Sequence, residues 1–130
     1  MSEQTACRGI RGAITVEDGV AQATARLLDA LQEANGCRPD QMAAVVFTVT
    51  DDLPDANPAA AARAGGWHDV PLLVVREHGG GPSLPRCLRV LALWNTARRQ
   101  DQIQHVYLGG AEALRPDIVE GGTHGRGDEG

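Results

Sequence analysis

The sequence predicts a single mixed α/β domain, an α+β sandwich in which helices pack on one face of a β-sheet. Three observations indicate this fold class. Short apolar or β-branched runs recur along the chain, only two segments have helical character, and 42% of the 130 residues are hydrophobic. A chain of this length can bury one core and has no room for a second.

The first third of the chain holds the clearest strand and helix. Residues 8–16 alternate charged or small residues with apolar ones, which predicts a strand that buries Ile10 and projects Arg11 to the other face. Asp18 can cap the following helix, and Asn35-Gly36 supplies its stop. The residues that recur at helical spacing are Val20, Ala23, Leu27, Leu31 and Ala34.

Five further elements follow, and most are strands. Residues 43–50, 70–75 and 87–94 are short β-branched or apolar runs bounded by turn residues, as expected of strands covered on at least one side. The alanine-rich segment 58–64 is predicted to be helical, and residues 105–108 form a short final strand. The predicted order is β, α, β, α, β, β, followed by a short tail.

Both ends of the chain are predicted to lie outside the folded domain. Residues 1–7 form a polar lead-in. Residues 119–130 are rich in glycine and charge, and they are poor in the apolar groups that would offset the entropy cost of ordering. The expected domain therefore spans residues 8–118, with a flexible segment at each end.

Composition argues against several classes of function. The formal net charge of −5 provides no basic field for nucleic acid or for an anionic membrane surface. No apolar run approaches the ~20 residues of a membrane-spanning helix. Cys7, Cys37 and Cys87 are widely spaced without a C-x-x-C pair, and no secretory signal is recognisable. We therefore expect a soluble protein of the reducing cytoplasm.

The sequence contains none of the usual motifs for a cofactor or a metal. No G-x-G-x-x-G follows a predicted strand, and no Gly-Lys-Ser/Thr of a phosphate-binding loop is present. The histidines lie far apart, without the paired spacing of zinc or iron ligands. We expect neither a metal nor a cofactor. The four histidines are His68, His78, His105 and His124.

The most informative residue is Arg89, which lies inside the apolar run 87–94. A guanidinium there must either reach solvent or face an anion. Glu77, just after the predicted strand 70–75, could be that anion in a structural salt bridge, or it could bind a hydroxyl. Exposed charge remains the alternative for three further arginines that are candidates for the same pocket. They are Arg11, Arg63 and Arg115.

Five blocks of sequence together carry a family resemblance. They are RGIRGA (8–13), VFTVT (46–50) with Asp52-Leu53, LPRCLRV (84–90), HVYL (105–108) and LRPD (114–117). In this order and spacing they closely resemble the AroH-type chorismate mutases, the small trimeric α/β class of monofunctional enzymes. Several blocks in order are more specific than any single motif.

The resemblance implies a ferredoxin-like α/β sandwich and a homotrimer that forms a pseudo-barrel, with three active sites at the clefts between subunits. It implies that Arg89 contacts the ether oxygen and a carboxylate of chorismate. Arg11 and Tyr107 are implied to hold the enolpyruvyl carboxylate, and Glu77 to accept from the ring hydroxyl. The other implied site residues line the mouth and wall: Asn57, Ala59, Ala60, Arg63, Leu72, Leu73, Val74, Leu114 and Arg115.

The implied activity is the isomerase reaction from chorismate to prephenate, in the biosynthesis of phenylalanine and tyrosine. It is a pericyclic rearrangement inside one molecule, so it requires no acid, base, nucleophile or cofactor. A protein can select the compact conformer and place a fixed positive charge where the breaking ether oxygen becomes negative. The permanently charged, rigidly forked guanidinium of Arg89 suits the second task.

Three positions depart from the family pattern. The family commonly has an aromatic residue and a lysine flanking a Pro-Ala step where this chain has Asn57 and Ala60. An apolar contact and a cation near the entrance are therefore missing, and we expect substrate affinity to change more than the chemistry. Val74 replaces the cysteine usual in the wall, which matters little if that position acts through its backbone.

Two other functions remain open from the sequence. A trimer of the same fold could bind a carboxylate of the aromatic pathway without catalysis, which the changes at Asn57 and Ala60 motivate. The joint presence of four polar residues argues against this alternative, since simple anion binding would not need all of them. They are Arg11, Glu77, Arg89 and Tyr107. An imine or enamine deaminase on a similar trimer is the second alternative, and it rests on fold analogy alone.

Overall fold

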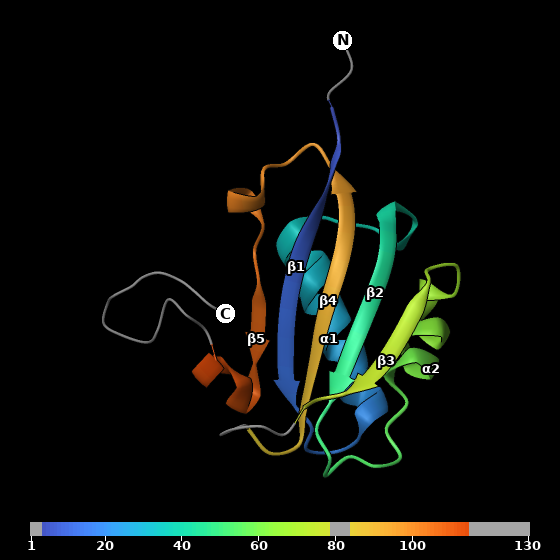
Figure 1. Cartoon of the computed structure of the whole chain (residues 1–130), viewed down its shortest axis with the longest axis vertical. Helices are drawn as coiled ribbons and strands as arrows, with labels where there is room; N and C mark the ends of the chain where they lie inside the picture. The colour runs from blue at the N-terminus through green and yellow to red at the C-terminus, as the bar shows by residue number, and fades with distance from the viewer. Residues whose placement is uncertain (1–3, 79–83, 115–130) are drawn as a thin grey trace.

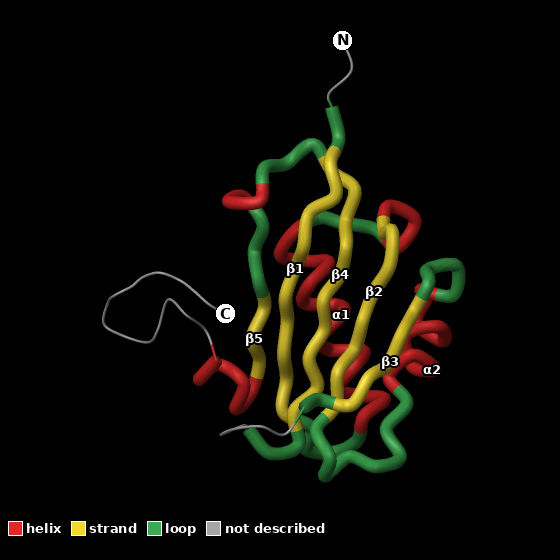
Figure 2. The backbone as a smooth tube through the Cα atoms, in the orientation of Figure 1, coloured by secondary structure: helices red, strands yellow, loops and turns green. Residues whose placement is uncertain are grey.

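A computed structural model describes residues 4–78 and 84–114 of the chain. It consists of one five-stranded sheet with two α-helices behind it (Figures 1 and 2). Neither α-helix covers the face that is turned to the viewer, which we call the open face. This arrangement confirms the predicted α/β sandwich. The elements are β1 (Ala6–Thr15), α1 (Val20–Asn35), β2 (Met42–Val49), α2 (Pro58–Ala62), β3 (Leu72–Arg76), β4 (Cys87–Thr96) and β5 (Val106–Leu108).

The strands lie in the order β3-β2-β4-β1-β5, with β4 in the centre. Strand β4 runs antiparallel to both of its neighbours, whereas β3 and β5 run parallel to theirs. Side chains alternate between the two faces of a strand. In β4, Leu88, Val90 and Ala92 are buried toward the helices, so Arg89 and Leu91 lie on the open face. The register therefore decides which residues meet there.

The main core fills the space between the sheet and α1. Ile10, Phe47 and Leu88 come from three different strands, and each is fully buried. Leu27 and Leu31 of α1 are buried against them. Arg11, next to Ile10, projects to the open face and is partly exposed, as the alternation in residues 8–16 predicted. None of the described helices is long and apolar enough to cross a membrane.

The ends of α1 agree only in part with the sequence prediction. The N-cap is Gly19 and no side chain caps the helix. The prediction of Asp18 as the cap was wrong because it lies one residue too early to take the N-cap position. The predicted stop is confirmed: Gly36 has a left-handed φ of 71°, and its N–H donates to the carbonyl oxygen of Gln32 at 2.7 Å.

Ala34 was expected on the apolar face of α1, and it is exposed. Thr24, Leu28 and Asn35 are buried instead, along with the predicted Ala23, Leu27 and Leu31. The buried stripe of the helix is therefore centred slightly later along the chain than the apolar pattern alone indicated. Asn35 can occupy a buried position because its side-chain amide donates to the carbonyl oxygens of Leu31 and Gln104.

Other boundaries also differ from the prediction. The segment predicted as helix 58–64 is α-helical to Ala62 and continues as a π-helical turn, Arg63–Trp67, in which Gly66 has a φ of 104°. Strand β3 begins at Leu72 rather than at residue 70. Three short 3-10 helices were not predicted, Pro39–Gln41, Gln100–Gln102 and Gly109–Leu114. The predicted tail, 119–130, lies outside the described residues.

Replacing Leu27 by alanine should lower the free energy of unfolding by about 3 kcal/mol, because the side chain is fully buried between α1 and the sheet. Urea denaturation measures the change. The exposed residue Gln22 on the same helix provides the control, and Gln22→Ala should change stability by less than about 0.5 kcal/mol. Similar small effects of both substitutions would contradict the packing described here.

Candidate active site

One row of paired residues crosses the open face and brings together residues from four strands. Arg89 of β4 pairs with Thr48 of β2 on one side and with Ala13 of β1 on the other. Ala13 pairs in turn with Tyr107 of β5. Because paired residues in adjacent strands project to the same face, all four side chains lie on the open face. Ala13 itself is buried, in a small cluster against which Tyr107 packs.

Glu77 lies beside Arg89, directly after the end of β3. Its Oε1 atom is 3.2 Å from Nε of Arg89, and the two side chains are 19% and 39% exposed. The backbone N–H of Glu77 donates to the carbonyl oxygen of Val49 at 2.8 Å, which fixes the residue against β2. The Thr48 hydroxyl lies within 3.5 Å of the same carboxylate oxygen. The salt bridge between Arg89 and Glu77, which the sequence predicted as one of two possibilities, is therefore formed within one chain.

This ion pair does not satisfy the hydrogen-bonding capacity of the guanidinium. Nε of Arg89 is buried, and it has no hydrogen-bond partner among the described residues. Its distance from Glu77 fits an ion pair, but its N–H is not directed at the carboxylate. The short distance therefore does not amount to a hydrogen bond, because hydrogen bonds weaken steeply when the donor N–H does not point at the acceptor. A buried donor without an acceptor is costly, and an anionic ligand on the open face could remove that cost.

Arg11 lies on the same face, two residues before Ala13 in β1. Its backbone N–H donates to Nδ1 of His105 at 3.0 Å, just before β5 begins. Burial, and secondarily the charge of Arg11, lower the pKa of His105. The ring is therefore neutral near pH 7, and its Nδ1 atom is free to accept. This contact fixes the backbone from which the Arg11 side chain projects.

A small hydrophobic cluster covers the corner of the open face next to Tyr107. Cys87 lies in this cluster two residues before Arg89, and burial raises the pKa of its thiol even though the Arg89 charge opposes this. The thiol is therefore protonated near neutral pH, and it contributes apolar surface. The buried members of the cluster are Ala13, Cys87 and Ala111, with Leu84, Tyr107 and Leu114 packed against them.

The residues predicted at the mouth lie mostly in the helical layer, on the other side of the sheet from Arg89. Ala59 is buried in α2, and Arg63 is exposed immediately after this helix. Asn57 is the N-cap of α2, and its Oδ1 accepts from the N–H of Ala60 at 3.1 Å. Within a single chain these residues do not meet the polar row. Arg115 lies outside the described residues.

The three residues predicted for the pocket wall face different ways. Leu73 of β3 is 57% exposed, and the alternation of the strand places it on the open face. Leu72 and Val74 are partly buried and pack against the main core. Leu73 is therefore the one side chain of the three that lies on the same face as Arg89.

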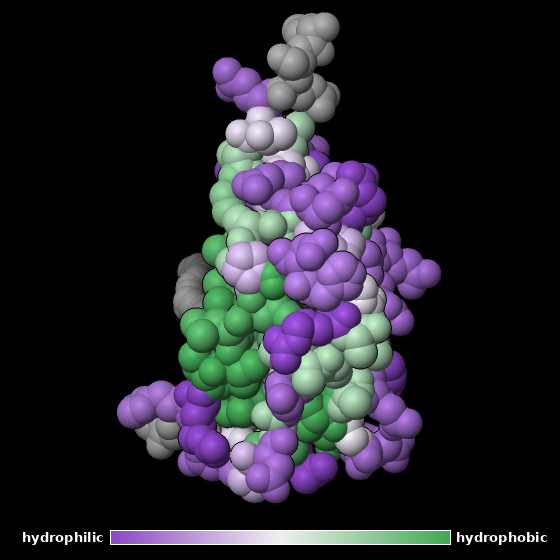
Figure 3. Space-filling model, turned by 90° about the vertical axis from the view of Figure 1, so that its right-hand side faces the viewer, coloured by the Kyte–Doolittle hydropathy of each residue, from purple (hydrophilic) through white to green (hydrophobic). Residues whose placement is uncertain are grey.

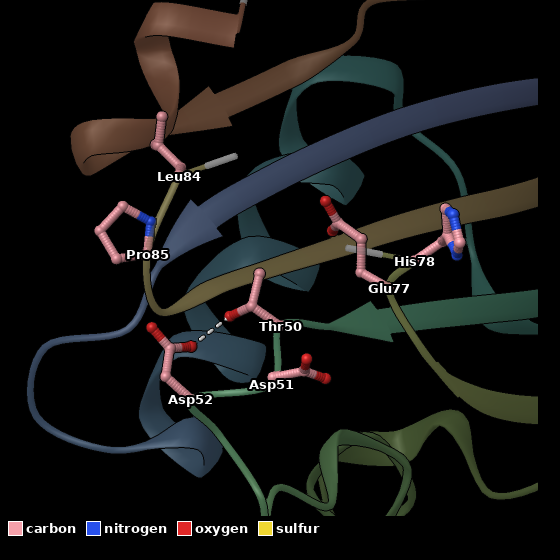
Figure 4. Close-up of a pocket in the computed structure, with 7 residues that line it drawn as sticks. All are labelled: Thr50, Asp51, Asp52, Glu77, His78, Leu84 and Pro85. Carbon is pink, nitrogen blue, oxygen red and sulfur yellow. Dashed lines mark hydrogen bonds between the residues drawn. The ribbon is translucent and has the colours of Figure 1, made fainter. Parts of the chain in front are cut away.

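A pocket of about 200 Å³ adjoins Glu77 at the lower end of the sheet (Figure 4). Its ionisable groups are three carboxylates and one histidine, so it is poorly suited to a dicarboxylate. No group of three or more His, Cys, Asp and Glu residues in the described part of the chain is placed to hold a metal. The pocket is lined by Thr50, Asp51, Asp52, Glu77, His78, Leu84 and Pro85.

Sequence reasoning missed three residues of this region. Thr48 and Ala13 take their importance from pairing with Arg89, and the register between distant strands is not visible in the sequence. His105 was weighed as a metal ligand and belongs to the block HVYL, but its role as the acceptor of a hydrogen bond from the backbone of Arg11 was not foreseen. The alternation in residues 46–50 could have placed Thr48 on a polar face, but not beside a particular arginine.

Comparisons with known proteins agree on one family. Residues 7–118 match the family model described as chorismate mutase type I. The chain is 56% identical over 116 residues to a chorismate mutase AroH of Thermus thermophilus, an alignment that covers 85% of this chain and 95% of that protein. It is 39% identical over 116 residues to the chorismate mutase AroH of Bacillus subtilis (strain 168), covering 85% and 91%.

A solved structure is similar over nearly the same extent. A chorismate mutase from Clostridium thermocellum superposes with a TM-score of 0.78 at 41% sequence identity. The match covers 82% of this chain and 98% of that chain. Similarity in both sequence and structure therefore extends over most of the chain.

The contact between His105 and Arg11 predicts a pH dependence of stability. Because the folded-state pKa of His105 lies below its ordinary value of 6.5, the unfolded chain binds a proton first as the pH falls. The free energy of unfolding should therefore decrease as the pH drops from 6.5 toward the folded-state pKa. Urea denaturation at about pH 7.5 and about pH 5.5 measures this decrease.

The matched variant is His105→Asn, whose side-chain oxygen can accept from Arg11 but does not titrate. It should reduce the difference in stability between the two pH values, while other groups contribute equally to both proteins. An unchanged pH dependence in the variant would contradict a role for His105 protonation.

Proposed function

This chain belongs to the type I chorismate mutase family, and on that premise we propose that chorismate binds on the open face of the sheet, around Arg89. The protein is an isomerase that converts chorismate to prephenate, a precursor of phenylalanine and tyrosine. A carboxylate-binding protein without catalysis is not favoured, given these relatives. The observation that carries the location is the buried Nε of Arg89, which has no acceptor among the described residues.

Arg89 supplies the fixed positive charge in this proposal. During the rearrangement the ether C–O bond breaks while a C–C bond forms in the same molecule, and negative charge collects on the ether oxygen. No proton has to be transferred to or from the protein. A donor that is already aimed at the developing charge does not have to reorganise during the reaction. The central strand and the ion pair with Glu77 hold Arg89 in this way.

Arg11 and Tyr107 hold the enolpyruvyl carboxylate, and Glu77 accepts from the ring hydroxyl. The order across the open face supports these roles, because Glu77 and Tyr107 lie on opposite sides of Arg89. A substrate held at both ends across Arg89 is restricted to its compact conformer, which is the second contribution that a protein can make to this reaction.

We also propose that the enzyme is a homotrimer that forms a pseudo-barrel, with active sites at the clefts between subunits. Leu73, Val75 and Leu91 are large apolar residues that are 57%, 39% and 40% exposed. By strand alternation they lie on the open face, and Figure 3 shows a hydrophobic area on the flank of the molecule that continues this face. Exposed apolar surface of this kind marks an interaction site. A neighbouring copy could then bring its own α2 and Arg63 to the mouth.

We further propose that the chain forms a single catalytic domain that works in the cytoplasm. The family match over residues 7–118 supports the proposed domain of residues 8–118. Cys7, Cys37 and Cys87 are all free thiols, which supports a reducing compartment. The predicted lead-in 1–7 extends too far, because β1 begins at Ala6 and Cys7 pairs with Asn95 of β4.

Arg89→Ala should lower kcat by about 100-fold to 1000-fold, because the charge on the ether oxygen exists only in the transition state. Arg89→Lys should recover little of the lost kcat, since an ammonium does not reproduce the forked guanidinium. The loss of chorismate absorbance, recorded without metal or cofactor, measures turnover. Arg26 is exposed on α1 and far from the row, so Arg26→Ala is the charge-matched control. A kcat of Arg89→Ala close to that of the control would contradict the proposal.

The oligomeric state can be measured by light scattering during size-exclusion chromatography. With a chain mass of 13.7 kDa, the parent should elute as a species of about 41 kDa, as expected of a closed three-fold assembly. Leu91→Asp places a charge on the open face and should yield smaller species with little activity. Ala25→Asp, on the exposed side of α1, should leave the trimer intact. A monomeric parent with full activity would overturn the trimer.

A further inference from the structure

Strand β4, which carries Arg89, begins next to a residue in an unusual backbone conformation. Arg86 has a φ of 51°, and it is the only described residue other than glycine with a positive φ. This left-handed region is disfavoured for residues that have a Cβ, so surrounding contacts must hold it. Arg86 lies three residues before Arg89, so its conformation sets the direction in which the strand begins.

One set of these contacts comes from the end of β2. Oδ2 of Asp52 accepts from the backbone N–H of Arg86 at 2.8 Å. Oδ1 of the same carboxylate accepts from the Thr50 hydroxyl, a bond that is drawn in Figure 4. The Thr50 oxygen in turn accepts from the N–H of Cys87 at 3.0 Å, and the Thr50 N–H donates to the Cys87 carbonyl at 3.2 Å.

A second set of contacts comes from the end of β1. The N–H of Val16 donates to the carbonyl oxygen of Arg86 at 2.7 Å. Nε of Arg86 donates back to the carbonyl oxygen of Val16 at 2.9 Å. The first residues of β4 are therefore tied to both neighbouring strands, on the end of the sheet that lies next to Glu77. We call the hydrogen-bonded group Thr50, Asp52, Arg86 and Cys87 the β4 anchor.

The charge of Asp52 suits this arrangement. The Thr50 hydroxyl, and secondarily the Arg86 amide, lower the pKa of the Asp52 carboxyl. The group is therefore ionised near neutral pH and can accept both hydrogen bonds at once. Asp51, one residue earlier, has one side-chain contact among the described residues, an exposed ion pair with Arg76. The two neighbouring aspartates thus differ in their contacts.

We propose that Thr50 and Asp52 are positioning residues for the rearrangement, because they hold the start of β4 so that the Arg89 guanidinium is fixed beside Glu77. The inference rests on the proposed role of Arg89. Neither residue needs to touch the substrate. A displacement of about 1 Å at a catalytic group can cost on the order of 100-fold in rate, so a looser strand start is sufficient to impair the reaction.

The test compares matched variants at two positions of the β4 anchor. Thr50→Val is nearly isosteric and removes the hydroxyl, whereas Thr50→Ser retains it. Asp52→Ala removes both carboxylate contacts, and Asp51→Asn is the control for loss of a nearby charge. In the chorismate assay, Thr50→Val and Asp52→Ala should lower kcat by about tenfold or more with a smaller change in KM. Thr50→Ser and Asp51→Asn should remain within about threefold of the parent.

A double-mutant cycle separates positioning from general destabilisation. Adding Asp52→Ala to Arg89→Ala should cause no further loss of kcat, because the anchor acts through Arg89. Folding of each variant is checked by circular dichroism, and Thr50→Val provides the test if Asp52→Ala does not fold. Parental kcat in the folded anchor variants, or an undiminished further loss in the Arg89→Ala background, would overturn the inference. Parental kcat in Arg89→Ala itself would instead refute the proposed role of Arg89.

Discussion

The placement of a guanidinium in the central strand of the sheet is the constraint on which the rest of the site depends. Arg89 lies among buried apolar neighbours, and Glu77 compensates its charge without accepting a hydrogen bond from Nε. An ion pair kept only for stability gains little over apolar residues of similar size. An arginine that is paired in charge but not in hydrogen bonding is better explained by an anionic ligand. The activity of the family supplies such a ligand, since chorismate is a dicarboxylate.

In the described chain, the polar residues around Arg89 and the residues predicted for the mouth of the active site lie on opposite sides of the sheet. The row around Arg89 lies on the open face. Arg63 directly follows α2, which lies behind the sheet (Figure 1). Assembly through the exposed apolar residues of the open face would join these two halves in neighbouring copies. Asn57 gains a structural explanation as the N-cap of α2.

Much of the fold could be predicted because side-chain alternation and helical spacing are local properties. Ile10 is buried and Arg11 projects to the other face, as the two-residue period requires. The pairing of Arg89 with Glu77 could be anticipated as one of two possibilities, since a charge in an apolar strand needs a partner. The neighbours Thr48 and Ala13 could not be predicted, because they depend on the register between strands. Nor could the left-handed φ of Arg86, because its partner Asp52 is 34 residues away in the sequence.

In the proposed trimer, Arg89 of one copy and Arg63 of another act in the same site. Mixing two impaired variants, Arg89→Ala and Arg63→Glu, after unfolding and refolding them together tests it most directly. If sites are shared, random trimers should restore about a quarter of the sites to the parental pair, so the mixture should be far more active than either variant alone. An activity equal to the average of the two separate variants would contradict a shared site, as would full activity of Arg63→Glu on its own.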